Sequence, residues 1–182
     1  MRIIAGSARG RKLFSPEGMD VRPTTDKVKE SLFNIIQFEI PGARVLDLFS
    51  GTGQLGLEAL SRGATEAVFV DASGKSLATV KKNVALCGFG DRSRLVSGDA
   101  FAYLARGEGP FDLVFLDPPY HKGLCDRALA MLLPCLGEQA AVICETQADE
   151  ALPERCGELV LHREYRYSAI MLRVYRRKER EE

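Results

Sequence analysis

From residue 43 to the end of the sequence, short apolar segments alternate with helical patterns, and this alternation constrains the fold more than any other feature. Strands are predicted over residues 44–49, 66–70, 94–96, 111–116, 140–145, 157–165 and 169–176, and helices over 54–62, 75–86, 99–105 and 126–133. Such alternation is typical of a mostly parallel sheet with helices packed on it. We therefore expect an α/β sandwich of seven strands, the last two of which form an antiparallel hairpin.

The first 42 residues are organised differently. Residues 2–5 and 12–15 flank a turn between Gly6 and Gly10, which predicts a short β-hairpin. A helix is expected after Pro23, because Thr24 can cap it and apolar residues recur at helical spacing from residue 28 to residue 36. The 182 residues have the length of one ordinary domain. We divide them into a hairpin extension over residues 1–22 and a main domain over residues 23–182.

The charges are unevenly distributed although they sum to zero. The chain has 25 basic and 25 acidic residues, but residues 1–29 hold seven basic and three acidic residues, and residues 163–182 hold seven and four. Basic segments at both ends suggest contact with an anionic partner. For the C-terminal tail an ordinary solvated surface is an equally good interpretation, because glutamates are interleaved with its basic residues.

The sequence carries no sign of a membrane or secreted protein. No apolar run reaches the roughly 18 residues of a transmembrane helix, and the N-terminus lacks the apolar block of a signal peptide. The five cysteines are an odd number without a C-x-x-C pair, which argues against disulfides and against a zinc site. We expect reduced thiols, a cytoplasmic protein and no bound metal.

A glycine-rich turn follows the first strand of the alternation. Gly51, Gly53 and Gly56 fit the pattern G-x-G-x-x-G, which lets the backbone approach a ligand closely. Asp71 ends the next strand, where an acid can bind ribose hydroxyls. Asp47 lies just before the glycines, and its charge would repel a pyrophosphate but attract the methionine ammonium of S-adenosylmethionine. The pattern predicts S-adenosylmethionine as cofactor, the alternative being a turn that only packs helix on sheet.

A second motif, Asp117-Pro118-Pro119-Tyr120, follows an apolar strand. Its prolines fix the backbone and remove two N–H donors, which leaves carbonyl oxygens available as acceptors. With the carboxylate of Asp117, these acceptors suit an exocyclic amine, and Tyr120 offers a face for stacking a flat base. The motif predicts methyl transfer to the amine of a nucleobase by proximity and alignment. Adenine, cytosine and guanine are equally compatible with this chemistry.

The two motifs together resemble the class I S-adenosylmethionine-dependent amino-methyltransferases. A wider set of segments resembles the RsmD family, which methylates the N2 amine of a guanine in 16S ribosomal RNA; the segments are residues 2–6, 9–11, 22–24, 29–34 and 47–53. The resemblance extends from residue 2 to about residue 177. It implies a Rossmann-like class I methyltransferase sandwich. It also implies 16S rRNA as the substrate, either free or in a small-subunit ribosomal particle.

The resemblance also implies roles for individual residues. Those expected to bind the cofactor are Arg22, Thr24, Asp47, Phe49, Gly51, Thr52, Gly53, Asp71, Asp99 and Ala100. Those expected to hold the target amine and to carry out catalysis are Asp117, Pro118, Pro119 and Tyr120. Separately from the resemblance, the basic character of the N-terminal segment leads us to expect that Arg2, Arg9, Arg11 and Lys12 contact RNA.

Three other functions compete with this prediction. An enzyme of the same fold could methylate adenine N6 or cytosine N4 in DNA, although 182 residues leave no room for a separate recognition domain. A non-catalytic RNA-binding module is disfavoured because Asp47 and residues 117–120 are intact. A nicotinamide-dependent oxidoreductase is disfavoured by Asp47 and by the lack of an acid or base beyond the loop. A monomer is expected, since no second interface stripe is visible.

Overall fold

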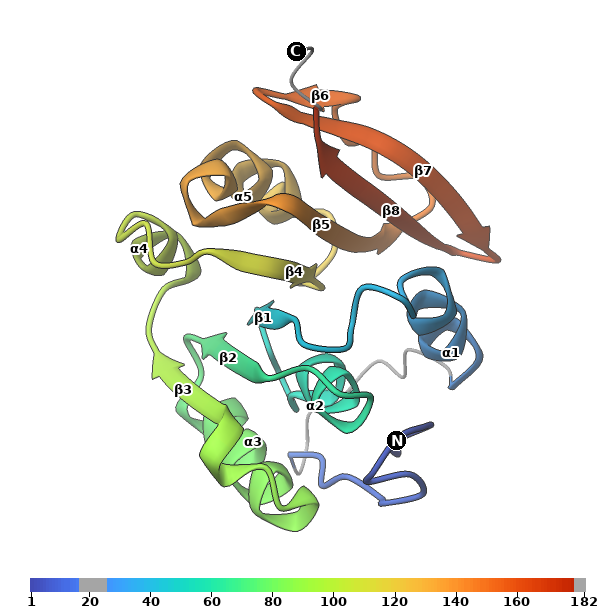
Figure 1. Cartoon of the computed structure of the whole chain (residues 1–182). Coiled ribbons are helices and arrows are strands. Elements are labelled where there is room, and N and C mark those ends of the chain that lie inside the picture. The colour runs from blue at the N-terminus through green and yellow to red at the C-terminus, as the bar shows by residue number, and fades with distance from the viewer. Residues whose placement is uncertain (17–25, 179–182) are drawn as a thin grey trace.

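Figure 1 shows the computed structural model of the chain, which describes residues 1–16 and 26–178. The strands are β1 (Arg44–Leu48), β2 (Glu66–Asp71), β3 (Ser93–Ser97), β4 (Phe111–Leu116), β5 (Leu136–Gln147), β6 (Arg155–Cys156), β7 (Leu159–Tyr167) and β8 (Ile170–Arg177). The helices are α1 (Asp26–Ile35), α2 (Gln54–Ser61), α3 (Gly74–Cys87), α4 (Ala100–Leu104) and α5 (Leu124–Leu132), with short 3-10 turns η1 (Gly90–Arg92) and η2 (Leu133–Cys135). The predicted alternation of strands and helices is confirmed.

The strands form one mixed sheet with the order β3-β2-β1-β4-β5-β8-β7-β6. β1 to β5 run parallel, and β8, β7 and β6 follow, each antiparallel to the strand before it in this order. The predicted closing hairpin is therefore confirmed as β7 and β8. The sheet of the described residues has eight strands instead of seven, because the two-residue β6 is too short to show an apolar pattern in sequence. The strand order reverses between β1 and β4, which is where sheets of this kind bind ligands.

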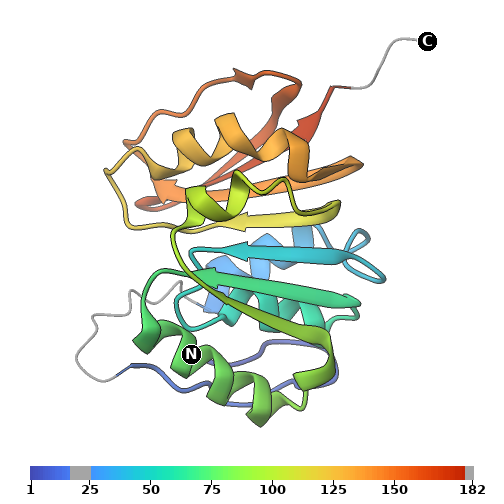
Figure 2. The same ribbon diagram turned by 90° about the vertical axis from the view of Figure 1, so that its left-hand side faces the viewer.

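Helices cover both faces of the sheet. Figures 1 and 2 show α4 and α5 on one face and α1 and α2 on the other. Along β1, Val45 belongs to the part of the core that includes residues of α1, α2 and α3, and the next residue, Leu46, belongs to the part that includes residues of α4 and α5. This follows from the alternation of side chains along a strand. Because both faces are covered, β1, β2 and β4 are almost wholly buried, which explains their nearly continuous apolar sequences.

The N-terminal segment, residues 1–16, folds back on itself as a short hairpin and lies across α2 and α3. Within the described residues its β-pairing is one isolated bridge between Arg2 and Lys12. The carboxylate of Glu58 in α2 accepts hydrogen bonds from the backbone N–H groups of Ile4 at 2.8 Å and Ala5 at 3.0 Å. The predicted short hairpin is present, since the N–H groups of Ile3, Gly10 and Leu13 also donate to backbone carbonyls of the opposite flank, and Glu58 fastens it to α2.

Glu58 is also the centre of a buried charged cluster. Lys29 and Glu58 are both fully buried, with Lys29 Nζ 3.6 Å from Glu58 Oε2, and Arg62 Nε donates to Glu58 Oε1 at 2.8 Å. Burial lowers the pKa of Lys29, while the charge of Glu58 opposes this change. No sequence pattern indicates this cluster. Its function is to fasten the N-terminal segment to α1 and α2.

In the parts of the chain that the structure describes, no helix combines the length and the apolar composition needed to cross a membrane. The predicted N-cap of α1, Thr24, and its neighbour Arg22 lie outside the described residues.

Candidate active site

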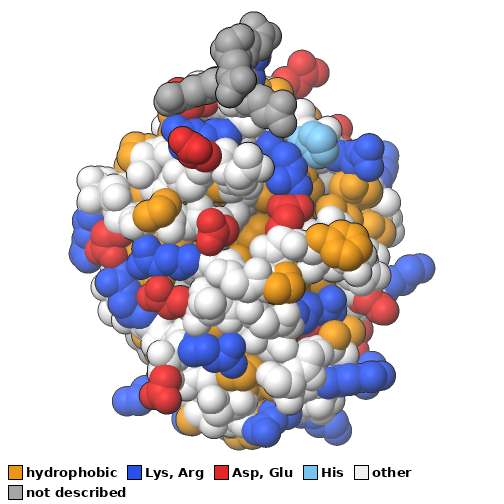
Figure 3. All heavy atoms as spheres, in the orientation of Figure 1, with side chains coloured by type: hydrophobic (Ala, Val, Ile, Leu, Met, Phe, Trp, Pro, Cys, Tyr) orange, Lys and Arg blue, Asp and Glu red, His pale blue; other side chains and the backbone are white. Residues whose placement is uncertain are grey.

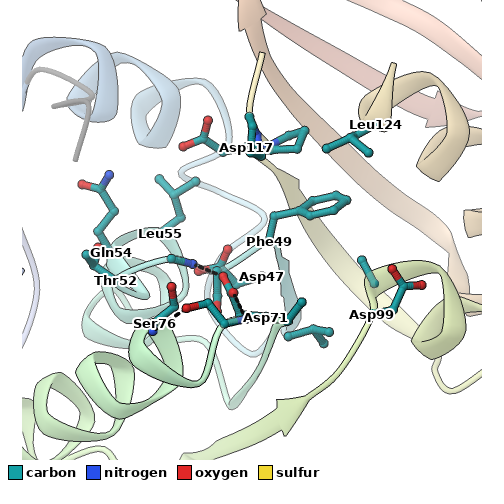
Figure 4. A pocket seen from close by; sticks show the side chains of 18 of the residues that line it. Asp47, Phe49, Thr52, Gln54, Leu55, Asp71, Ser76, Asp99, Asp117 and Leu124 are labelled. Carbon is teal, nitrogen blue, oxygen red and sulfur yellow. Dashed lines mark hydrogen bonds between the residues drawn. The ribbon is translucent and has the colours of Figure 1, made fainter. Parts of the chain in front are cut away.

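A cavity of about 670 Å³ opens where β1, β2 and β4 end. The carboxyl ends of parallel strands meet at one edge of a sheet, so acidic residues that follow different strands are brought together there. Asp47, Asp71, Asp99 and Asp117 all line this cavity (Figure 4). Other residues predicted from the sequence line it too, namely Phe49, Gly51, Thr52, Ala100, Pro118, Pro119 and Tyr120. Most of the cavity wall was therefore predicted from the sequence.

Asp47, at the end of β1, is only 2% exposed. Its Oδ2 accepts a hydrogen bond from the backbone N–H of Gly56 at 2.9 Å. Burial raises the pKa of Asp47 well above its ordinary value, the charges of Asp117 and Asp71 add to the rise, and the bond from Gly56 opposes it. A carboxylate in such an environment is stabilised in its ionised form by a cation beside it. The site is therefore suited to a ligand with a positive charge at this point.

The glycines between β1 and α2 serve two different purposes. Gly51 and Gly53 have φ of 54° and 77°, in the left-handed region that only glycine adopts freely. Gly56 is needed for space, because a Cβ there would lie 2.4 Å from Cε1 of Phe69 and 3.2 Å from Oδ2 of Asp47. The first two glycines thus shape the turn, and the third lets α2 pack closely on β2 and on Asp47.

The backbone of the turn is held by Asp71 of β2. Its Oδ2 accepts from the N–H of Gly51 at 2.8 Å, and its Oδ1 accepts from the N–H of Ser73 at 2.8 Å. Each oxygen keeps a second lone pair that can accept from a ligand hydroxyl. Nearby, the buried hydroxyl of Ser50 borders the cavity and has no hydrogen-bond partner among the described residues. The cavity therefore offers several polar groups to a ligand.

Two aromatic side chains, Phe49 and Phe101, form one wall of the cavity. The rings of Phe49 and Phe101 meet edge to face, with centroids 6.1 Å apart, and the guanidinium of Arg127 lies 3.8 Å from the centroid of Phe101. Exposed Asp99 caps α4 by accepting from the N–H of Ala102 at 2.9 Å through Oδ1. This wall combines flat apolar surface with a carboxylate, which suits a heteroaromatic ring carrying an amine.

The tetrapeptide 117–120 follows β4 and forms another part of the cavity wall. Pro118 is buried and Pro119 is exposed, and Asp117 and Tyr120 are half-buried. The hydroxyl of Tyr120 donates a hydrogen bond to Oε1 of Glu145 at 3.2 Å. Glu145 lies near the end of β5, the neighbouring parallel strand, and is only 2% exposed. This acid was not predicted to belong to the site, and its place at the end of the predicted strand 140–145 was the available signal.

A second network that was not predicted supports the chain after the tetrapeptide. Glu150 accepts from the backbone N–H of His121 at 3.0 Å and of Gln147 at 3.1 Å. Arg173 of β8, only 5% exposed, donates to the carbonyl of Glu150 at 2.8 Å and to Thr146 Oγ1 at 2.6 Å. In the sequence Arg173 belongs to the basic C-terminal end, but in the structure its side chain is buried and binds Thr146 and Glu150.

The basic residues predicted to contact RNA lie on the N-terminal segment. Arg9 and Lys12 are exposed. Arg2 forms an exposed ion pair with Asp26 at 2.9 Å, and the guanidinium of Arg11 donates to a backbone carbonyl of α3. Residues 1–16 and 26–178 contain no group of three or more His, Cys, Asp or Glu placed to bind a metal ion.

A family model described as Conserved hypothetical protein 95 matches residues 1–176. The chain belongs to this family. The similarity to RsmD proteins extends along the chain: Ribosomal RNA small subunit methyltransferase D of Escherichia coli (strain K12) is 37% identical over 179 residues, which are 97% of this chain and 90% of that protein. YlbH of Bacillus subtilis (strain 168) is 39% identical over 183 residues, 98% of this chain and 100% of that protein.

The solved structure of yhhF from Escherichia coli has a TM-score of 0.88 to this member of the RsmD family, at 37% identity, and covers 99% of each chain. The expected Rossmann-like methyltransferase sandwich is therefore confirmed. The family resemblance drawn from residues 2–53 is confirmed as well.

Proposed function

We propose that this RsmD family member transfers a methyl group from S-adenosylmethionine to the exocyclic N2 amine of a guanine in 16S ribosomal RNA. The observation that carries the proposal is a single cavity whose wall contains both the buried carboxylate of Asp47 and the tetrapeptide 117–120. One side suits a cationic cofactor and the other an amine. Relatives named as small-subunit ribosomal RNA methyltransferases support the choice of RNA over DNA.

In this proposal different residues of the cavity bind the methionine, ribose and adenine parts of the cofactor. Asp47 faces the methionine ammonium, because its ionised form gains from an adjacent cation. Asp71 accepts from the ribose hydroxyls while it holds Gly51. Asp99 and Ala100 border the adenine, beside the rings of Phe49 and Phe101. Thr52 and Gly53 complete the glycine-rich loop. Arg22 and Thr24 are predicted to close over the cofactor. When bound, S-adenosylmethionine supplies an electrophilic methyl group.

In this proposal the tetrapeptide 117–120 binds the amine of the target base. Asp117 and the carbonyl of Pro118 accept hydrogen bonds from the two N–H groups of the amine, which directs its lone pair at the methyl carbon. Pro119 keeps the turn rigid, and Tyr120 stacks on the base while Glu145 holds its hydroxyl. Because both groups are already held in alignment, the chemical step avoids much of the entropy loss of a bimolecular reaction. The methylated amine releases its proton to solvent.

Exposed Arg9 and Lys12, with Arg2 and Arg11, are proposed to contact phosphates of the RNA. Such contacts increase affinity without reading sequence. We extend the proposal to a monomeric cytoplasmic protein that acts on 16S rRNA or on the small ribosomal particle. Its described cysteines are all free thiols, as a reducing compartment favours.

The test is methyl transfer from labelled S-adenosylmethionine to 16S rRNA and to 30S particles that lack the modification, followed by digestion to nucleosides. Labelled N2-methylguanosine is expected. Asp117→Ala should abolish transfer and keep the affinity for S-adenosylhomocysteine, whereas Asp91→Ala, which removes an exposed carboxylate before β3, should behave as wild type. Label in DNA, in N6-methyladenosine, or undiminished in Asp117→Ala would contradict the proposal.

A further inference from the structure

A basic surface beside the cavity is not explained by the cofactor. Residues 1–16 and helix α3 together contain seven Lys and Arg residues and no Asp or Glu. The two elements are in contact, since the guanidinium of Arg11 donates to the carbonyl of Leu86 in α3. Lys and Arg side chains gather over these elements in the lower part of Figure 3. Apart from the pairing of Arg2 with Asp26, this local excess of positive charge in a chain of zero net charge suits a polyanion.

Phe14 lies within this basic surface. It is 53% exposed, although large apolar side chains are mostly buried, and exposed Arg11 and Lys12 precede it. Its backbone is fixed on both sides by one residue of α3. The N–H of Phe14 donates to Asn83 Oδ1 at 2.7 Å, and its carbonyl accepts from Asn83 Nδ2 at 3.1 Å. The ring is therefore presented to solvent from a rigid backbone.

Asn83 also connects Phe14 to the cofactor loop. It is fully buried, and its Nδ2 donates to the carbonyl of Thr52 at 3.0 Å, so the carbonyls of Phe14 and Thr52 share one donor nitrogen. Thr52 lines the cavity. A single buried amide with three hydrogen bonds thus holds an exposed aromatic residue close to the rim of the site.

We infer that Phe14 is a stacking platform for an unpaired base of the RNA strand that flanks the target nucleotide. The inference rests on the proposed function, because it takes RNA as the substrate. Unpaired RNA bases are commonly held on aromatic side chains. Every base has a flat face, so stacking works with any sequence and joins naturally to phosphate contacts by Arg9 and Lys12. The platform holds the strand while the target base enters at Asp117.

The chain has no tryptophan, which makes a direct test possible. Phe14→Trp introduces the single tryptophan of the chain at the platform, and its emission is excited selectively over that of the five tyrosines. Phe38→Trp is the matched control, since Phe38 is 90% exposed in the connection that leads to β1. A short labelled oligoriboadenylate is added without cofactor, and its anisotropy reports binding. Fluorescence of Phe14→Trp should be quenched as the oligonucleotide binds, while that of Phe38→Trp should not change.

Affinity gives the second readout. Phe14→Ala should bind the oligonucleotide about 5- to 100-fold more weakly than wild type, and Phe14→Trp should bind as tightly as wild type. Phe38→Ala should match wild type, and affinity for S-adenosylhomocysteine should be unchanged in Phe14→Ala. An unaltered affinity of Phe14→Ala, unquenched Phe14→Trp in the bound state, or failure of wild type to bind would overturn the inference.

The two proposals can fail separately, because methyl transfer to rRNA tests the function and oligonucleotide binding tests the platform. If Phe14→Ala lost affinity for 30S particles alone and bound the oligonucleotide like wild type, Phe14 would contact a ribosomal protein. That result would also overturn the stacking inference.

Discussion

Replacing Asp47 by Asn separates the cost of a buried carboxylate from its use in ligand binding. The substitution keeps the size of the side chain, and its carbonyl oxygen can still accept from the N–H of Gly56, now 2.9 Å from Oδ2. It removes a group whose pKa is raised by burial and by the charges of Asp117 and Asp71. The free Asp47→Asn protein should therefore be at least as stable at neutral pH as the wild type.

Ligand affinity should fall in the same variant. A hydrogen bond to a charged group contributes about 1.5–3 kcal/mol, so loss of the pairing between Asp47 and the methionine ammonium should weaken S-adenosylhomocysteine binding about 10- to 100-fold. Titration calorimetry measures this affinity, and thermal unfolding measures the stability of the free protein. Asp91→Asn, which neutralises an exposed carboxylate, is the matched control.

The pH dependence provides an independent check. Because its pKa is raised, Asp47 binds a proton in the free protein at pH values where an exposed aspartate is ionised. An adjacent ammonium favours the ionised form, so binding releases this proton, and affinity should increase as pH rises from the ordinary aspartate range to the raised pKa. Asp47→Asn should lack that increase. Equal affinities, or the same pH profile in both proteins, would refute the reasoning.

Three further predictions concern packing, the buried cluster and RNA. Gly56→Ala should lower the free energy of unfolding by about 1–3 kcal/mol through overpacking. Gly74→Ala is the control, because nothing lies within 4 Å of the added carbon. Equal effects of the two substitutions in a denaturant titration would show that close packing at α2 is unimportant. Glu58→Gln should cost about 3–5 kcal/mol in the same titration, because it leaves a fully buried lysine uncompensated, and a change under 1 kcal/mol, roughly the value of an exposed pair, would contradict this. Arg9→Ala combined with Arg11→Ala should weaken rRNA binding and reduce its dependence on salt, and an unchanged salt slope would make these residues structural.

Much of the fold and part of the site could be predicted from local patterns. Burial on both faces of the sheet makes β1 and β4 nearly uniformly apolar, so their positions are visible in sequence. Parallel strands place their carboxyl ends at one edge, so Asp47, Asp71 and Asp117 could be assigned to one site from their positions in the sequence alone.

Contacts between distant segments could not be predicted in this way. Glu58 reads as an ordinary helical glutamate, yet it is fully buried and accepts from Ile4 and Ala5. The sequence predicted the short hairpin of residues 2–15, but not that Glu58 would fasten it to α2. Glu145 likewise meets Tyr120 only when β4 and β5 pair. Arg173 reaches Thr146 and Glu150 only when β5 and β8 pair.

The sequence by itself determined the order of strands and helices, the glycine turn and the acidic residues at the strand ends, because each depends on a few neighbouring residues and on the periodicity of the backbone. Only the tertiary structure decided that Asn83 links Phe14 to the cofactor loop and that Glu58 anchors the N-terminal segment. These links join residues far apart in the chain. Their formation depends on how α2 and α3 pack, which no local pattern encodes.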